Sequence, residues 1–186
     1  MAITRLGGAN AITGTIPQGN IANASLGAVT ALPAAITTGK VLQVVTATTT
    51  GTGLLSTSTS YVDSGLSATI TPASTSNKIL ITFCHNVILD ATVTTDFRGD
   101  VRIVRGSTEI AEFEDAKMNR ATGGDSSYVR DTVQSSFQHL DTPSTTSATT
   151  YKTQFRASGG SGTRFGIEAD SNCRSNVILM EIAGWL

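Results

Sequence analysis

Residues 78–90, which read KILITFCHNVILD, form the longest apolar run of the chain and decide its fold. Large apolar side chains recur at alternate positions of this run: Ile79, Ile81, Phe83, Val87 and Leu89. Because the side chains of a β-strand point to opposite faces in turn, this spacing predicts a strand. Leu80 and Ile88 have the other parity, so both faces of the strand are apolar. We therefore expect a central or interface strand, and we predict that Leu80 and Ile88 contact other subunits.

Strand and turn patterns continue on both sides of this run. Further strands are expected at 41–45, 60–63, 66–71, 101–104, 109–113, 128–140 (one strand or two), 151–157, 164–168 and 177–182. The pair Gly106-Ser107 predicts a two-residue hairpin turn, because glycine adopts positive φ without strain. No segment has a convincing helical pattern. About eight to ten short strands without helices are typical of an all-β protein, and we predict a jelly-roll-like β-sandwich.

The first 39 residues have a different composition. They contain one charged residue, Arg5, and no aromatic residue, and they follow neither a helical nor a strand period. Such a segment cannot build its own core and lacks the charge that keeps a disordered tail solvated. We therefore predict an extended N-terminal arm at 1–39 that lies on another protein, ahead of a body at 40–186. The side chains expected to anchor the arm are Ile3, Arg5, Leu6, Ile12, Ile16 and Ile21.

Composition excludes several classes of protein. Charged residues make up 15% of the chain, and the net charge is −1. No basic stripe exists that could track phosphates, which argues against a nucleic-acid partner. No run of about 18 apolar residues could span a membrane, and the opening MAITRLGG lacks the apolar core of a signal peptide. Cys84 and Cys173 are too few for a disulfide framework and are expected to be reduced.

Several short segments together resemble a known family. The segments are VLQVV at 41–45, TSYVD at 59–63, GLSATITP at 65–72, SNKILI at 76–81, LDTP at 140–143, TTYKTQ at 149–154 and LMEI at 179–182. In this order and spacing they resemble the β-rich C-terminal domains of tail-fibre and related virion proteins of tailed bacteriophages, especially aquatic ones. The opening ITRLGGAN at 3–10 also resembles the start of such proteins.

The resemblance implies a trimeric structural protein of the virion, assembled in the host cytoplasm and often contacting the host surface. We expect a homotrimer that joins other virion proteins through its arm and serves as a tail fibre or short spike. A capsid decoration or head-fibre protein is the first alternative, and a glycan-degrading tailspike enzyme is the second. Contacts with a host glycan or protein are expected from loops 115–127 and 156–164. The candidate receptor-binding residues are Asn119, Arg120, Tyr128 and Arg164.

The histidines and cysteines give little support for a metal site. His85 has the parity of the apolar face of its strand, so a buried, hydrogen-bonded histidine is the simplest interpretation. Cys84 precedes it directly and must point to the opposite face, which opposes joint chelation of one ion. We expect no bound metal and no cofactor.

Two groups of carboxylates could be catalytic or bind calcium. Glu112, Glu114 and Asp115 could contain the acid pair of a glycosidase, but a solvated strand edge explains them more simply. Asp90, Asp96 and Asp100 read as a solvated set, with calcium as the alternative. We therefore expect a binding protein and not an enzyme.

Two further patterns could serve recognition. Arg98-Gly99-Asp100 spells a tripeptide known from integrin ligands, although Gly99 more simply forms a bulge or turn. Four aromatic residues could stack on a sugar: Tyr61, Tyr128, Tyr151 and Trp185. Tyr151 and Trp185 are expected in the core or an interface, which leaves Tyr128 as the preferred candidate.

Overall fold

The computed structural model describes residues 40–50, 54–91, 98–113, 129–158, 164–167 and 174–184. Within these ranges the chain forms strands and turns and no helix, and therefore no helix that could cross a membrane. The strands are β1 (Val41–Thr50), β2 (Leu54–Ser56), β3 (Val62–Ile70), β4 (Lys78–Ala91), β5 (Gly99–Arg105), β6 (Thr108–Phe113), β7 (Val129–Asp141), β8 (Thr149–Ala157), β9 (Arg164–Ile167) and β10 (Arg174–Ile182). Gly39–Leu186 forms one compact unit.

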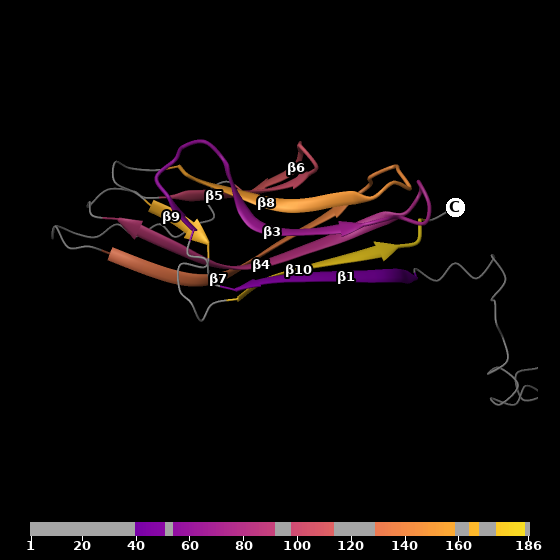
Figure 1. Ribbon diagram of the computed structural model, residues 1–186, viewed down its shortest axis with the longest axis horizontal. Coiled ribbons are helices and arrows are strands. Elements are labelled where there is room, and N and C mark those ends of the chain that lie inside the picture. The colour runs from indigo at the N-terminus through magenta and orange to yellow at the C-terminus, as the bar shows by residue number, and fades with distance from the viewer. Residues whose placement is uncertain are drawn as a thin grey trace, which may run out of the picture. The chain divides into compact units, whose positions relative to one another are not determined.

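Two antiparallel sheets lie face to face in this unit (Figure 1). Sheet A has the long strands β1-β10-β4-β7, and sheet B has the order β3-β8-β5-β6. The short strand β9 pairs with the second half of β4, beyond the end of β10, and β2 pairs with β9. The predicted all-β sandwich is therefore confirmed.

The eight long strands pair in a nested order. The first pairs with the last (β1 with β10), the second with the seventh (β3 with β8) and the third with the sixth (β4 with β7). The two middle strands, β5 and β6, form a hairpin whose turn contains Gly106 at φ +60°. A jelly roll requires this nested order, and the finer jelly-roll assignment stays a prediction with which the pairing agrees.

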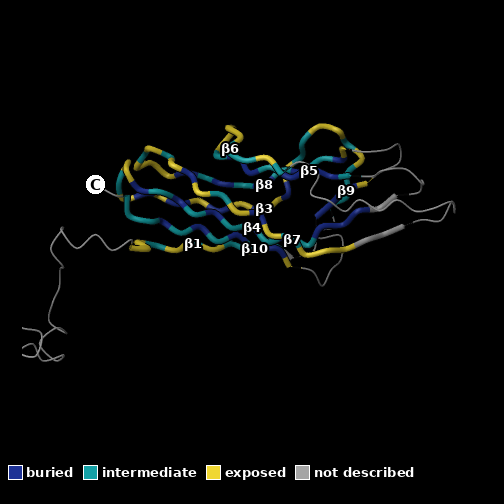
Figure 2. Tube along the Cα trace, turned by 180° about the vertical axis from the view of Figure 1, so that it is seen from behind, coloured by how far each residue is buried: buried dark blue, intermediate teal, exposed yellow. Residues whose placement is uncertain are grey.

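The core lies between the two sheets, where the inward positions of each strand meet (Figure 2). β3 and β8 alternate between buried and more exposed residues along their length, as the sequence period predicts. In β4 the residues from Ile79 to Leu89 with odd numbers are all buried. Leu80 is half-buried on the outer face of sheet A. Ile88 also has outward parity, but it is 1% exposed within the single chain.

Close packing depends on glycine at two positions, one between the two sheets and one within sheet A. A Cβ added at Gly99 in β5 would lie 2.0 Å from the Phe165 ring of β9, which belongs to the opposite sheet. A Cβ at Gly166 would lie 2.1 Å from the carbonyl oxygen of Leu54. Real Cβ atoms do not approach this closely, so β2, β5 and β9 reach their positions only because these residues lack a side chain.

The two ends of the sandwich differ. Lys40 enters beside the paired residues Val41 and Ile182, and the connections at this end are 71–77, 106–107 and 142–148. At the other end the strand registers bring together Ala91 with Val129 and Gly99 with Ala157. The segments 92–97, 114–128 and 159–163 begin and end at this second end. They lie outside the described residues, as does the predicted arm at 1–39.

Candidate functional site

A polar network covers the outer face of sheet B. Alternate residues of its strands point away from the core, and in this sheet most of those positions carry charged or amide side chains. The Lys152 ammonium lies 2.7 Å from the Asp63 carboxylate, which also accepts a hydrogen bond of 2.6 Å from Gln154. These two donors, Lys152 first, hold the pKa of Asp63 below its usual range. Asp63 is therefore ionised at neutral pH and cannot act as a general acid.

Arg102 continues this network across the sheet. Its Nε donates to Gln154 at 2.8 Å, and its Nη1 donates to Glu109 at 2.7 Å. β8, β5 and β6 are thereby connected by a row of side chains above the backbone ladder. Such exposed pairs each contribute little to stability, about 0–1 kcal/mol, but together they form a well-hydrated surface.

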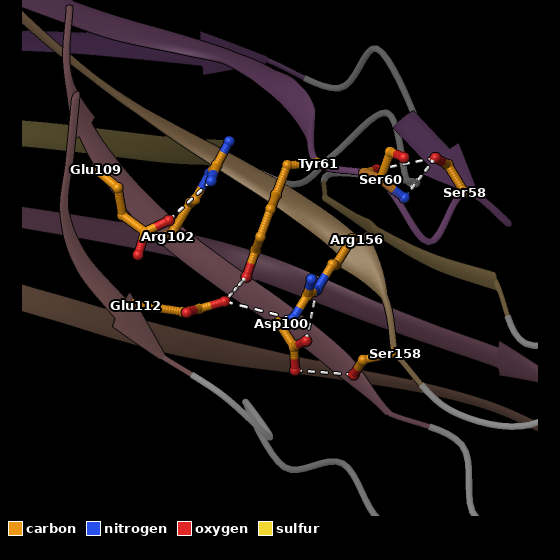
Figure 3. A network of polar contacts seen from close by, with 9 residues as sticks. All are labelled: Ser58, Ser60, Tyr61, Asp100, Arg102, Glu109, Glu112, Arg156 and Ser158. Carbon is orange, nitrogen blue, oxygen red and sulfur yellow. Dashed lines mark hydrogen bonds and ion pairs between the residues drawn. The ribbon is translucent and has the colours of Figure 1, made fainter. Parts of the chain in front are cut away.

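The Tyr61 ring lies on the same face, between two guanidinium groups (Figure 3). The Cζ atoms of Arg102 and Arg156 are 4.0 Å and 4.6 Å from the ring centroid, a cation–π geometry. The hydroxyl donates to the Glu112 carboxylate. Burial, and then this hydrogen bond, raise the pKa of Tyr61 above its usual value. Because a guanidinium lies on either side of the ring, Tyr61 offers no ring face on which a sugar could stack.

Asp100 anchors the second arginine and corrects a prediction. Its carboxylate is 3% exposed, accepts 2.8 Å bonds from Arg156 Nε and Ser158 Oγ, and therefore does not belong to a solvated acidic set. The same burial removes the Asp100 side chain from the surface, where an integrin-type tripeptide would have to display it. The bond to Asp100 is the main cause of a raised pKa at Arg156.

A buried carboxylate connects several segments at the end of the sandwich where Lys40 precedes β1, here called the Lys40 end. Glu181 is 0% exposed, and its oxygens accept hydrogen bonds from Gln43 Nε2, Asn77 Nδ2 and the Ala73 backbone N–H. Burial alone raises the pKa of Glu181, but the three donors outweigh it and hold the pKa below the usual value. This buried carboxylate was not predicted from the sequence. Its signal was a glutamate sharing the inward parity of Val177 and Leu179 in the last strand.

A shallow, open pocket lies at the same end, against the 142–148 connection. It encloses about 440 Å³ and is lined by Arg105, Gly106, Pro143, Thr145, Ser147, Ala148, Thr149 and Thr150. Arg105 Nη1 lies 2.8 Å from Asp141, which also accepts a 2.7 Å bond from the Tyr151 hydroxyl. Tyr151 is 0% exposed, which confirms its predicted place in the core. Burial, and then the bond to Asp141, raise its pKa.

His85 is buried and hydrogen-bonded, as the simplest interpretation predicted. It is 0% exposed, its Nε2 lies 2.8 Å from Thr153 Oγ1, and its ring stacks on Phe83 with centroids 5.8 Å apart. Cys84 is half-buried with outward parity, so the two side chains do point to opposite faces. Among the described residues, no group of three His, Cys, Asp or Glu side chains could hold a metal ion.

The remaining predicted site residues are placed as follows. Arg164 is exposed at the start of β9, where its backbone pairs with Asp90. Leu80 lies on the outer face of sheet A, as a subunit contact requires. Ile88 has no accessible surface left to offer a second subunit, so its predicted role is corrected: it belongs to the interior of the single chain. Glu112 is exposed on its strand, as predicted for a solvated strand edge.

Other predicted residues lie outside the described part of the chain. These are the arm residues Ile3, Arg5, Leu6, Ile12, Ile16 and Ile21, the loop residues Asn119, Arg120 and Tyr128, and also Asp96, Glu114, Asp115, Cys173 and Trp185. Of the four candidate receptor-binding residues, Arg164 alone belongs to the described residues, and it lies beside the end of β4.

No known protein family matches the sequence, and no curated protein matches it either. Among solved structures, the fold is similar to the crystal structure of the infectious bursal disease virus VP2 subviral particle, with a TM-score of 0.35 and 16% sequence identity. The match covers 76% of this chain and 38% of the VP2 chain. A likeness at this level carries no argument about function.

Proposed function

We propose that this chain is a structural protein of a bacteriophage virion, a tail fibre or short spike that is anchored by residues 1–39 and contacts the host surface with the opposite end of its body. The proposal combines the uncharged N-terminal segment with the resemblance carried by residues 41–182. It includes a homotrimeric state and a location on the assembled particle. A capsid decoration or head-fibre protein would use the same plan of arm and sandwich.

The observation that carries the proposal is the difference between the two ends of the sandwich. At the Lys40 end, Glu181 fixes the incoming strand β1 and the 71–77 connection through Gln43, Asn77 and Ala73. A covalently attached anchor needs such a firmly held end, because any load on the arm is transmitted through β1. At the other end the long connections begin and end.

Those connections suit recognition. Segment 114–128 follows β6 and segment 159–163 follows β8, and the paired strands of sheet B hold both strand ends in register. Variable loops on a rigid sheet are where binding proteins commonly place their contact residues. Arg164 lies at the base of this end and is the described member of the proposed contact surface.

We propose binding without catalysis. Three of the surface carboxylates, Asp63, Glu109 and Glu112, each lie within 3.4 Å of an arginine or lysine nitrogen. A glycosidase needs one carboxylic acid that stays protonated near neutral pH, whereas the hydrogen bonds from Lys152 and Gln154 hold the pKa of Asp63 below its usual range. Incubation of the full chain with host surface polysaccharide should release no reducing ends. Release that is lost in Glu112→Gln would establish an enzyme.

The test of the anchor compares the full chain with a chain that lacks residues 1–35. The shortened protein should stay folded and soluble, with the same melting temperature, and should no longer join particles assembled without the wild-type protein. A shortened protein that still joins particles refutes the anchoring role. Electron microscopy of particles carrying labelled full-length protein then separates a tail location from a capsid location.

A further inference from the structure

The outer faces of the two sheets differ in charge. Sheet B displays three ion pairs on its outer face, which join Lys152 to Asp63, Arg102 to Glu109 and Arg156 to Glu112. On sheet A, the outward positions of β4 from Lys78 to Asn86, with those of β1, β10 and β7 paired to them, carry a single charged residue, Lys78. An ordinary solvated surface has roughly a quarter to a third of its residues charged. The outer face of sheet A does not have the composition of a surface that stays in water.

Apolar side chains cross this face in one register row. Val44 of β1 pairs with Met180 of β10, Met180 with Leu80 of β4, and Leu80 with Leu140 of β7. All four have outward parity, so the row, here called the apolar row, extends over the full width of the four long strands. Val44 is 54% exposed and Leu140 is 47% exposed.

Apolar residues also lie next to the apolar row on both sides, toward the Lys40 end and away from that end. Val41, which pairs with Ile182, is 54% exposed, and Ile182 and Ile178 are half-buried on this face. In the register row of Ile178, the other outward positions of sheet A carry polar residues without charge, namely Thr46, Thr82 and Gln138. Contiguous apolar patches of this kind on soluble proteins mark interaction sites.

We infer that the outer face of sheet A is the contact surface between copies of this chain. A partner of ordinary composition would have to bury charges against a face that offers them almost no counter-charge, which is costly. A second copy has an equally uncharged surface available, namely its own sheet A. Because a surface that contacts its own equivalent forms a twofold interface, the inference concerns a pair of copies and is separate from the homotrimeric state included above. The inference rests on this face alone and does not depend on the virion role proposed above.

The area of the face is sufficient for such a contact. With strands about 4.8 Å apart and a rise of about 3.3 Å per residue, four strands of about ten residues present roughly 600 Å². Two such faces bury roughly 1,200 Å² in total, the lower limit of specific, stable interfaces. Ile88 takes no part, because it is buried in the single chain. Leu80 keeps its predicted role and gains Val44, Met180 and Leu140 as neighbours in the contact.

Sedimentation velocity of the full chain tests the inference. At about 50 μM the wild-type protein should sediment as an oligomer. Val44→Asp and Leu140→Asp change exposed residues at opposite edges of the apolar row, so each should weaken association on the order of 100-fold without unfolding the chain. The control is Ser67→Asp, which places the same charge at an exposed position of the edge strand β3, on the outer face of sheet B. It should leave the oligomer unchanged.

Circular dichroism of each variant verifies that the chain is folded. If one Asp variant unfolds, the association of the other Asp variant tests the inference. Val44→Thr is a substitution of the same shape that should also weaken association. A wild-type chain that sediments as a monomer refutes the inference and assigns the face to a different protein. An oligomer that survives the folded Asp variants also refutes it. Neither result bears on whether the protein joins particles, which is measured separately.

Discussion

The buried Glu181 carboxylate offers the sharpest test of how the Lys40 end is held. One of its three donors, Gln43, belongs to β1, and the other two, the Asn77 side chain and the Ala73 backbone N–H, belong to the 71–77 connection. No basic side chain is among them. Gln43 Nε2 also donates to the Thr71 carbonyl at 2.8 Å. In Glu181→Gln the shape is kept, but one acceptor oxygen becomes an NH₂ group.

The expected cost follows from these contacts. A hydrogen bond to a charged acceptor contributes about 1.5–3 kcal/mol, against about 1 kcal/mol for a neutral one. Glu181→Gln weakens the two bonds at Oε1 by about 1 kcal/mol each, and it places a donor against the Gln43 donor at the other position. The lower cost of burying an amide offsets part of this loss. We expect a net loss of about 3 kcal/mol in the free energy of unfolding at pH 7.

The pH dependence gives the test its sign. The folded-state pKa of Glu181 is lower than its unfolded value, so its contribution is fully present above about pH 4.3 and is lost as the pH falls through the folded value. Urea denaturation from pH 7 to pH 3 should therefore show the gap between wild type and Glu181→Gln narrowing below about pH 4. The control is Glu109→Gln, an exposed pair expected to cost under about 0.5 kcal/mol.

A constant gap across the pH range would refute this reasoning, because it would mean that the ionised carboxylate is not what the three donors stabilise. A difference of under about 1 kcal/mol in the free energy of unfolding between wild type and Glu181→Gln at pH 7 would refute the assigned strength of the charged hydrogen bonds.

Three further predictions concern other parts of the body. Of the three tyrosines, Tyr61 and Tyr151 should ionise only at pH values well above the usual tyrosine range, because burial and hydrogen bonds to carboxylates raise both pKa values. Absorbance titration of the folded chain measures this ionisation, with Tyr61→Phe as the reference. Gly99→Ala and Gly166→Ala should each lower the free energy of unfolding by at least about 2 kcal/mol, measured in urea, because the added Cβ has no room. Asp100→Ala should cost about 3 kcal/mol in the same assay, because it leaves Arg156 Nε and Ser158 Oγ without their acceptor; a cost near zero would show that Asp100 is not buried in solution.

Much of the fold could be predicted from local pattern. The alternation in 66–70 and 151–157 and the Gly106-Ser107 hairpin all correspond to observed strands and turns. Where one strand or two were predicted at 128–140, the structure has the single strand β7, Val129–Asp141. Strand period and turn chemistry act over a few residues, so they can be read without knowing the rest of the chain.

The candidate site was harder to predict because its members come from distant segments. Tyr61 meets Arg102 and Arg156 only because β3, β8 and β5 are neighbours in sheet B. Asp100 was predicted to be solvated because a carboxylate usually is, and nothing nearby in the sequence indicates its bond with Arg156.

The sequence by itself determined which residues share a face of each strand, since the period of two is a property of the backbone. It also determined that the chain is all-β, because turn residues interrupt every apolar run. Only the tertiary structure decided which of the two apolar faces of β4 and β10 is covered by sheet B and which is left outward. In β10 the two faces look alike in sequence, whereas in β4 the odd-numbered positions are the more apolar. The choice depends on the opposing sheet, whose contacts come from strands far away along the chain. That choice buries Ile79, Ile81 and Glu181 and leaves Leu80 and Met180 on the outer face.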